Sequence, residues 1–551
     1  MRPHLPAAKD LVRRWSRVGL GATVALAAAA ALPATAAASH TQLVMIQDGS
    51  DLSDPNAAMT EFRQLGANAV RVVVPWFEIA PNASAKKKPS FNATNPNAYP
   101  AANWQIFDAI DRAAAANGIT VDFTLSGGAP TWAQSVAPKS PGVNRLFLAW
   151  KPNAADYGQW VKAMGTRYSG HFKPTGATSA LPAVHFWALF NEPNFGQDLG
   201  PQGNSNGLTA TMYYRSLVNQ GYNALKATGH AGNTIVIGEL ADQGSEPGPN
   251  PKRTGGTPGN YGQTRPLLFI RQLYCVDTKF NELRGSAAKA IGCPTTASAS
   301  RKFRSQNPGL FNVNGLSMHP YGQSQSPVSK AGNKVDYGLF QDFPQVEATI
   351  DHVNKVYGSK KHLSIYNTEY GYITNPPQST HRPSYVSPAT AAYYINWAEY
   401  LSWKQSRVQS YMQYLLADPP PTAGPYQGFA SGLEFPNGTH KPSYDAFRLP
   451  VYMPKTSISH TTNAEIWGAA RPGAFMQKDG NGTPTIAIQL NGTTIKTLSV
   501  SSSGAYFDTK LKFPKSGTVR LAYTYPSSDP FLPVTDEGQT VFSRSFKITV
   551  H

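Results

Sequence analysis

The chain has 551 residues and a formal net charge of +17, with 41% hydrophobic and 15% charged residues. This composition is typical of a globular protein and excludes wholesale disorder, and the length suits a large domain together with a smaller one. The basic residues are scattered, and only residues 86–88 form a run of lysines, so we expect no nucleic-acid partner. A basic chain of this kind can instead favour an acidic polysaccharide or an anionic cell wall.

Residues 1–38 have the pattern of a secretory signal. A basic start is followed by an Ala-rich apolar stretch over residues 18–32 and by small residues around Ala36 that offer a cleavage site. A membrane anchor is the alternative, although the stretch is short for a span and no later segment is apolar enough to cross a bilayer. The segment holds five basic residues and one acidic residue, so cleavage lowers the net charge to +13. We therefore expect a secreted, extracellular protein, and the Ala-rich signal indicates a bacterial source.

From about residue 40 to 450, strand-like apolar runs alternate with amphipathic helical stretches. The predicted strands are residues 42–46, 69–74, 120–125, 183–190, 234–237, 315–318, 363–367 and 410–416. The predicted helices are residues 55–65, 104–117, 155–168, 212–227, 344–357 and 388–403, and the stretch between the fifth and sixth strands is the least clear. Eight strands alternating with helices predict an α/β fold, the (β/α)8 TIM barrel, whose active site forms at the C-terminal ends of the strands.

Two long connections and a change of pattern complete the organisation. Residues 77–103 and 241–265 follow strands and are rich in small, polar and Pro residues, so we expect them to wall a cleft on the catalytic face. From about residue 456 short alternating runs separated by turn residues predict a small C-terminal β-sandwich. The expected domains are thus 39–452 for the barrel and 456–551 for the sandwich. Trp467 is the sandwich's only Trp, which favours packing on the barrel over glycan binding.

Cys275 and Cys293 are the only two cysteines, and both follow the predicted signal. An oxidising destination favours a disulfide between them, and two free thiols are the alternative. Their separation of 18 residues means that the bond would close a local insertion.

Two glutamates occupy equivalent places in the predicted barrel. Glu192, within Asn191-Glu192-Pro193, follows the fourth strand, and Glu369 follows the seventh. Cleavage of a glycosidic bond requires one carboxylic acid to protonate the leaving oxygen and one carboxylate to attack the anomeric carbon or activate water. A helix start or a surface acid would explain either glutamate alone. The pair at two strand ends favours a sugar-cleaving site.

These motifs resemble glycoside hydrolase clan A, in the manner of family 5 or family 39. Members carry an Asn-Glu acid/base on strand four and a Glu nucleophile on strand seven, which Asn191, Glu192 and Glu369 match. His319-Pro320-Tyr321 resembles the strand-six His-X-Tyr, whose Tyr hydroxyl contacts the nucleophile, and Arg71 resembles the strand-two Arg that supports it. The resemblance covers most of residues 40–450 and implies retention of anomeric configuration, with Glu369 as nucleophile and Glu192 as acid/base.

Aromatic residues leave the sugar undefined. Trp76 and Trp132 follow the second and third strands and could stack on sugar rings, or could pack at the barrel rim. His319 could orient a hydroxyl group or pack against the rim. Many family 5 enzymes place a Trp at the end of strand eight, but the run 410–418 contains none.

The sequence therefore predicts a secreted retaining glycoside hydrolase with a carbohydrate substrate. A catalytically inactive glycan-binding protein and a wall-associated structural protein are the alternatives, and the complete pair of carboxylates argues against both. We find no cluster with convincing metal-ligand spacing and expect neither a metal nor a cofactor. The sugar, the linkage, exo or endo action and the oligomeric state are not indicated.

Overall fold

The computed structural model describes residues 39–551, except residues 40 and 50 and the segments 140–146, 205–206, 245–258, 330–334, 379–384, 422–427 and 502–503. The predicted signal, residues 1–38, lies outside the described residues. The described residues belong to one compact unit, 37–551. Within them, no helix combines the length and the apolar character needed to cross a membrane.

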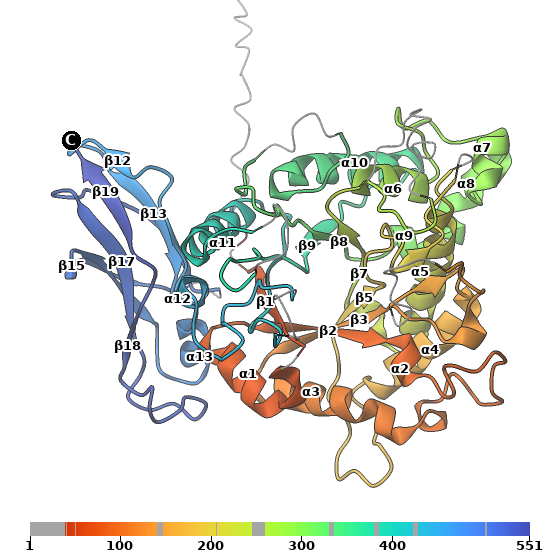
Figure 1. Ribbon diagram of the computed structural model, residues 1–551, viewed down its shortest axis with the longest axis horizontal. Coiled ribbons are helices and arrows are strands. Elements are labelled where there is room, and N and C mark those ends of the chain that lie inside the picture. Colours follow the sequence, from red (N-terminus) through yellow and green to blue (C-terminus); the bar gives the residue numbers. More distant parts are fainter. Residues whose placement is uncertain are drawn as a thin grey trace, which may run out of the picture. The chain divides into compact units, whose positions relative to one another are not determined.

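Eight parallel strands form the central sheet, with helices around it (Figure 1). The strands are β1 (Leu43–Gln47), β2 (Ala69–Pro75), β3 (Thr120–Ser126), β5 (Phe186–Leu189), β7 (Thr234–Ala241), β8 (Gly315–His319), β9 (Ser364–Asn367) and β10 (Ser410–Tyr414). Their order is β10-β1-β2-β3-β5-β7-β8-β9. A parallel bridge between Ile365 and Val408 joins β9 to the segment that leads into β10, which closes the barrel. The predicted TIM barrel is confirmed, with all eight strands at their predicted places.

The six predicted helices are also present. They are α1 (Pro55–Gln64), α3 (Gln105–Ala116), α4 (Ala154–Arg167), α5 (Thr209–Ala227), α10 (Phe343–Val356) and α11 (Pro388–Trp403). Local sequence fixes their starts: the side chain of Asn153 accepts hydrogen bonds from the first turn of α4, and Ser387 does so for α11, where Pro388 is the first residue. The short helix α2 (Trp76–Ile79) directly follows β2.

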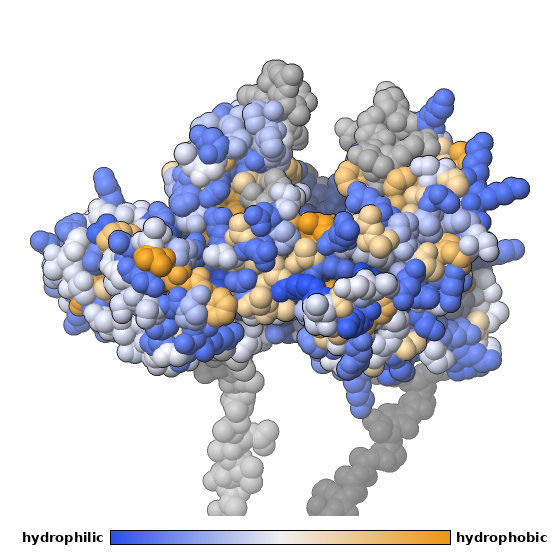
Figure 2. All heavy atoms as spheres, turned by 90° about the horizontal axis from the view of Figure 1, so that it is seen from below, coloured by the Kyte–Doolittle hydropathy of each residue, from blue (hydrophilic) through white to orange (hydrophobic). Residues whose placement is uncertain are grey.

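The barrel interior is apolar in its lower part and polar in its upper part, the upper part being the one toward the C-terminal ends of the strands. Seven buried side chains fill the lower part: Met45, Ala69, Phe186, Ala188, Val236, Tyr366 and Met412. Because side chains alternate along a strand, positions two residues further along β1 and β2 point inward again, and these are Gln47 and Arg71. A larger apolar cluster lies between strands and helices. Hydrophilic side chains cover most of the face seen in Figure 2. Because polar side chains otherwise lie mainly at the surface, the polar upper part of the barrel interior is unusual.

Strand β7 contains a bulge that the sequence prediction missed. Ile237 pairs with Leu316 but Leu240 pairs with Met318, so β7 carries one extra residue, and Gly238 and Glu239 both have positive φ angles of 103° and 46°. A Cβ atom on Gly238 would lie 2.7 Å from the carbonyl oxygen of Ser317, so only glycine fits. Bulges re-aim side chains and occur next to active sites.

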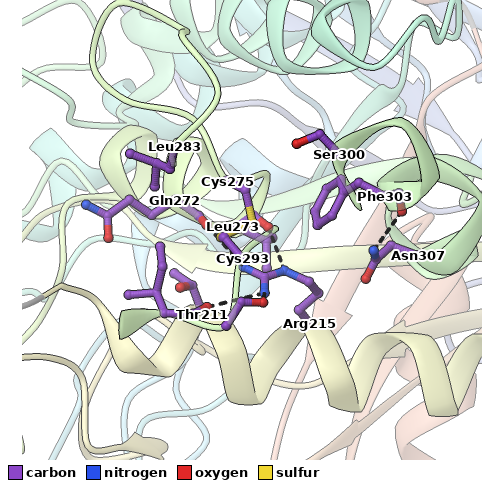
Figure 3. Close-up of a disulfide and its surroundings, with 12 residues drawn as sticks. Thr211, Arg215, Gln272, Leu273, Cys275, Leu283, Cys293, Ser300, Phe303 and Asn307 are labelled. Atoms are coloured by element: carbon purple, nitrogen blue, oxygen red, sulfur yellow. Dashed lines mark hydrogen bonds between the residues drawn. A yellow bond between two sulfur atoms is a disulfide. The ribbon is translucent and has the colours of Figure 1, made fainter. Parts of the chain in front are cut away.

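The described part of the unclear stretch between β7 and β8, residues 242–244 and 259–314, contains four α-helices and the disulfide. The helices are α6 (Pro266–Leu273), α7 (Gly285–Ala290), α8 (Ala297–Gln306) and α9 (Pro308–Phe311). Cys275 and Cys293 are bonded with Cα atoms 5.6 Å apart, as predicted. In Figure 3 the buried Arg215 of α5 lies below this bond, and its guanidinium donates to the carbonyl oxygens of Leu273 and Gly292. The disulfide closes the insertion on itself, and Arg215 fastens the insertion to α5.

The predicted C-terminal β-sandwich is confirmed. One sheet has the order β11 (Val451–Tyr452), β13 (Ala464–Ala469), β16 (Tyr506–Leu511). The other has the order β12 (Ser457–Ile458), β19 (Phe546–Val550), β17 (Gly517–Thr524), β14 (Thr485–Leu490), β15 (Thr493–Ser499), with β18 (Thr540–Phe542) paired to β17. A further pair, β4 (Ala149–Trp150) and β6 (Leu199–Gly200), joins two loops that follow β3 and β5.

Buried polar groups connect the sandwich to the barrel. Arg471 forms a short ion pair with Glu399 of α11, and the Tyr506 hydroxyl donates to the same carboxylate over 2.8 Å. Trp467 is fully buried in an aromatic cluster with Tyr400, Trp403, Tyr452 and Tyr506. The sandwich's only Trp therefore serves packing.

Candidate active site

Glu192 and Glu369 lie in one pocket at the C-terminal ends of the barrel strands. Glu192 is three residues beyond β5 and Glu369 two residues beyond β9. A carboxylate oxygen of each and a ring nitrogen of His319 all lie within 4.8 Å of one another. The pocket has a volume of about 320 Å³ and is lined by Glu192, Asp242, Tyr321, Gln323, Glu369, Gly371, Ile373, Tyr414 and Phe429. The fold thus joins two carboxylates that are 177 residues apart in the sequence.

The backbone around Glu192 is strained. Phe190 and Glu192 have φ angles of 79° and 37°, and neither is a glycine. Such residues cost on the order of 1–3 kcal/mol each and persist only where the surroundings enforce them. The amide of Glu192 donates to the carbonyl oxygen of Glu239 over 3.1 Å, which ties the strained turn to the bulge in β7. Strain of this kind is typical of a functional site.

His319 lies between the two carboxylates. Its Nδ1 is 2.9 Å from Oε1 of Glu192 and 3.6 Å from Oε2 of Glu369, and its side chain is fully buried. Burial alone would lower the pKa of His319, but the carboxylates of Glu369 and Glu192 outweigh this and raise that pKa above its usual value. The imidazole therefore adds positive charge between the two acids over a wider pH range than an exposed histidine would.

Arg71 organises the other side of the site. Its Nη1 donates to Oε1 of Glu369 over 2.7 Å, and its Nη2 donates to Oδ1 of Asn191 over 2.7 Å and to Oε2 of Glu239 over 2.6 Å. Burial opposes the charged form of Arg71, but Glu239 and Glu369 raise its pKa above the usual value. One fully buried guanidinium thus orients the residue before Glu192 and the carboxylate of Glu369 together.

Glu239 is the main residue that the sequence analysis missed. It is fully buried, and its two oxygens accept from Nε and Nη2 of Arg71 over 3.2 and 2.6 Å. Thr124 donates to it over 3.2 Å. A charged residue inside an otherwise apolar strand, directly after a glycine, was the available signal. The neighbouring Asp122 is also fully buried, and burial and the charge of Glu239 raise its pKa well above the usual range, which favours the uncharged form of its carboxyl group.

The environment of Glu369 favours its ionised form. Burial raises the pKa of Glu369, but the charges of His319 and Arg71 and a hydrogen bond from Tyr321 outweigh it, so the pKa lies below its usual value. Tyr321 donates to Oε2 over 3.1 Å. Both oxygens of Glu369 are therefore held by donors, which is the arrangement that keeps a carboxylate charged and fixed in orientation.

Asn191 is held on both sides of its amide. Its Oδ1 accepts from Arg71, and its Nδ2 donates to Oδ1 of Asp198 over 2.9 Å. Its backbone amide donates to the hydroxyl of Ser126 at the end of β3. Burial and the nearby charge of Glu192 raise the pKa of Asp198 well above its usual range. Asn191 is thus positioned beside the pocket with one amide proton left for a ligand.

Aromatic side chains form one wall of the pocket. Tyr414 ends β10, where the resemblance suggests a Trp, and it packs edge-to-face against Phe429 with ring centres 5.4 Å apart. Tyr321 packs edge-to-face against Phe429 at 5.6 Å. Phe429 is 37% exposed. The sequence analysis missed Tyr414 and Phe429, because it looked for a Trp and because Phe429 lies on a long loop with no periodic pattern.

Of the two alternatives for Trp76, stacking on a sugar ring or packing at the barrel rim, its burial fits packing. Trp76 is only 2% exposed and lies in a cluster where it stacks on Trp160 and meets the edge of Tyr157. Trp132 is half-buried, packs edge-on against Trp76, and donates through its indole nitrogen to the carbonyl oxygen of Pro81. Neither lines the pocket with the two glutamates. The contacts of both side chains therefore fit packing at the rim.

Among the residues that the structure describes, two groups of side chains have distances suited to a metal ion. One is Glu192, His319 and Glu369, and the other is Glu61, Glu434 and His440. In the first group, Arg71 and Tyr321 already occupy the oxygens of Glu369, and the guanidinium places a positive charge beside any ion. Its donor set fits acid–base chemistry on an organic substrate better than cation binding. In the second, His440 bonds to Glu434 over 3.1 Å and stacks on Tyr444.

Comparisons with known proteins give similarities of structure only. No family model and no curated protein matches the chain. A family 39 glycoside hydrolase from Bacteroides cellulosilyticus is 15% identical, over 86% of this chain and 79% of that chain, with a TM-score of 0.44. A glucosidase from Croceicoccus marinus is 13% identical, over 93% and 82%, with a TM-score of 0.44. A β-glucuronidase from Bacteroides uniformis is 10% identical, with a TM-score of 0.39. That match spans 93% of this chain but only 46% of the β-glucuronidase chain. At such values the matches carry no conclusion about activity, which is inferred below from the site itself.

Proposed function

We propose that the protein is a retaining glycoside hydrolase that cleaves O-glycosidic bonds in a poly- or oligosaccharide. The observation that carries this proposal is the shared pocket of Glu192 and Glu369, in which one carboxylate oxygen of each lies within 4.8 Å of the other. Retaining enzymes hold their two carboxyl groups about 5–5.5 Å apart, whereas inverting enzymes need about 6.5–9.5 Å to admit a water molecule. The short separation supports double displacement.

Glu369 is the nucleophile in this proposal. Arg71 and Tyr321 hold its two oxygens, and the lowered pKa keeps it ionised at neutral pH. In the first step a carboxylate oxygen attacks the anomeric carbon, the bond to the leaving oxygen breaks, and a covalent ester forms. The ionised state and fixed orientation are what such an attack requires.

Glu192 is the acid/base. In the first step it gives its proton to the leaving oxygen, and in the second it takes a proton from the water that attacks the anomeric carbon and releases Glu369. His319 contacts both carboxylates through Nδ1 and so can hold them in their relative positions. Asn191 can offer its remaining amide proton to a sugar hydroxyl.

We also propose that the protein acts outside the cell. Support comes from the signal-like pattern of residues 1–38 and from the disulfide between Cys275 and Cys293. The resulting basic chain would be attracted to anionic polysaccharide or cell-wall surfaces.

The test is a screen of the purified protein against p-nitrophenyl glycosides and against plant, fungal and bacterial polysaccharides. We expect hydrolysis with retention, read by NMR of the first-formed anomer. Glu369→Gln should lower turnover by roughly 10⁴-fold or more. Glu192→Gln should cost much more on substrates with poor leaving groups than on p-nitrophenyl glycosides, which need little protonation.

Three results would contradict the proposal. Inversion would mean that water, not Glu369, attacks the anomeric carbon. Equal losses in Glu192→Gln on both kinds of substrate would remove its role as the acid. Glycan binding without any release of reducing ends would favour the inactive binding protein.

A further inference from the structure

Asp242 is a buried carboxyl group in the pocket that the proposed mechanism does not use. It directly follows β7, is 6% exposed, and lines the pocket with Glu192 and Glu369. Its backbone carbonyl accepts from Gly338 over 2.9 Å, and Oδ2 accepts from Nε2 of Gln243 over 3.0 Å. A carboxyl group has about four acceptor positions, so these contacts leave capacity for a ligand in the pocket.

Asp242 is held rigidly relative to Glu192. The buried side chain of Asn194 donates to the carbonyl oxygen of Ala241 and accepts from the amide of the same residue, each over 2.9 Å. These two bonds fasten the turn that carries Glu192 to the end of β7. A binding group on such a support keeps its distance to the acid without depending on a mobile loop.

Asp242 lies on the Glu192 side of the pocket. Strands β5 and β7 are direct neighbours, whereas β8 separates β7 from β9, which carries Glu369. Burial raises the pKa of Asp242 well above its usual range and the nearby charge of Glu192 raises it further, which is consistent with this closeness. Gln243 extends the polar edge, because Nε2 of Gln323, another residue of the pocket, lies 3.5 Å from its Oε1.

The acid/base of a retaining enzyme acts on the oxygen of the leaving group, and the nucleophile acts on the anomeric carbon. Groups beyond the acid therefore meet the leaving part of the substrate. We propose that Asp242 is a specificity-determining residue that hydrogen-bonds a hydroxyl group of a leaving saccharide, so that the natural substrate carries a sugar on both sides of the cleaved bond. This inference rests on the proposed function and names the substrate's second half.

The test compares two substrates with the same glycone. One is the p-nitrophenyl glycoside cleaved fastest in the screen, and the other is the disaccharide with the same non-reducing sugar. In Asp242→Ala we expect kcat/KM to fall roughly 10- to 100-fold on the disaccharide, the usual effect of losing one bond to a carboxyl group. On the p-nitrophenyl glycoside we expect a change of about threefold at most, since nitrophenol offers no hydroxyl at that place.

A second readout uses the covalent intermediate. The site of the leaving sugar is also the site where an added sugar can accept the glycosyl group, because the two half-reactions are the reverse of each other. The p-nitrophenyl glycoside serves as donor and the free monosaccharide as acceptor. Asp242→Ala should then lower the ratio of transfer to hydrolysis by roughly 10-fold or more. A purely structural residue would not change this ratio.

Asp342→Asn is the matched control. Asp342 is a nearby carboxylate that does not line the pocket, and its bond from the amide of Leu339 can be accepted by an asparagine oxygen. This variant should leave kcat/KM unchanged on both substrates. Where Asp242→Ala fails to fold, Asp242→Asn keeps one acceptor and should show a smaller loss confined to the disaccharide.

The possible outcomes separate this inference from the proposed function. Equal losses on both substrates would place Asp242 against the glycone or make it act through Glu192, and unchanged rates on both would remove it from substrate binding. Either result overturns the inference and leaves the glycosidase intact. A wild-type protein that cleaves neither substrate refutes the proposed function and this inference with it.

Discussion

Two buried arginines, Arg71 and Arg471, differ in whether a partner of the guanidinium is exposed to the pocket. Arg71, at the catalytic end of the barrel, pairs with the fully buried Glu239 and with Glu369, whose side chain is 14% exposed to the pocket. Arg471, where the sandwich meets the barrel, pairs with Glu399, and both side chains are 1% exposed. The first guanidinium has one partner that is free to meet a substrate, and the second has none.

This difference separates positioning from assembly. Three of the partners of Arg71 are Glu369, Asn191 and Glu239, which lie at or near the ends of three different strands around the pocket. Those of Arg471 are Glu399 and the carbonyl oxygen of Phe447, and its guanidinium also lies over the Phe447 ring at 4.3 Å. We expect changes at Arg71 to act mainly on catalysis and changes at Arg471 to act mainly on stability.

The largest effect should follow from Arg471→Met. It leaves Glu399 buried with only the Tyr506 hydroxyl as a partner, and breaking a buried ion pair in this way costs about 3–5 kcal/mol of stability. Below the melting temperature, kcat of the folded protein should be unchanged. Chemical denaturation and kinetics together measure this. The double variant Arg471→Met with Glu399→Leu should recover most of the stability; if it does not, the ion pair is not the main tie between sandwich and barrel.

Arg71→Lys should come next and should act on activity. Lysine keeps the charge but cannot donate to Glu369, Asn191 and Glu239 at once, so both reacting carboxylates lose their fixed orientation. We expect kcat/KM to fall roughly 10²-fold or more on p-nitrophenyl glycosides. Arg471→Lys is the control and should lower stability while leaving kcat unchanged. Similar activity losses in both variants would end the distinction between the two arginines.

The sequence predicted the frame of the barrel better than the interior of the site. All eight strands were found because apolar runs of parallel strands are continuous and easily read. Glu239 was missed because the predicted fifth strand stopped at residue 237, before the bulge at Gly238. Asp242, Tyr414 and Phe429 were missed because nothing in a local pattern tells which loop side chains converge. The role of Trp76 stayed open, since an aromatic residue after a strand can face the pocket or the helix layer, and only tertiary packing decides.

Tyr321→Phe should have a smaller effect than Arg71→Lys, because Arg71 remains on Glu369. The loss of one hydrogen bond to a charged group is worth about 1.5–3 kcal/mol, or a roughly 10- to 100-fold lower rate. The ring keeps its packing against Phe429, so the melting temperature should change by a few degrees at most. Tyr274→Phe removes a buried hydroxyl bonded to Leu310, far along the chain from the site, and should not lower kcat. Full activity in Tyr321→Phe would exclude the hydroxyl from catalysis.

The smallest effect should be a shift in pH dependence. Arg71 forms ion pairs with both Glu239 and Glu369. Glu239→Gln removes one of these two ion-pair partners and with it a negative charge near Glu369. The pKa of Glu369, already below its usual value, should fall further, and the acid limb of kcat/KM should move to lower pH by about one unit. The same lowered pKa also affects the stability of the fold. A carboxylate with a depressed folded-state pKa stabilises the fold above its unfolded pKa of about 4.3, and this contribution is lost as the pH falls through the folded value. Asp122→Asn is the control, because burial and Glu239 raise the pKa of Asp122 and favour its uncharged form, so the limb should stay in place. An acid limb that does not move in Glu239→Gln, measured where both proteins are folded, would mean that Glu239 holds the shape of the site without setting the charge of Glu369.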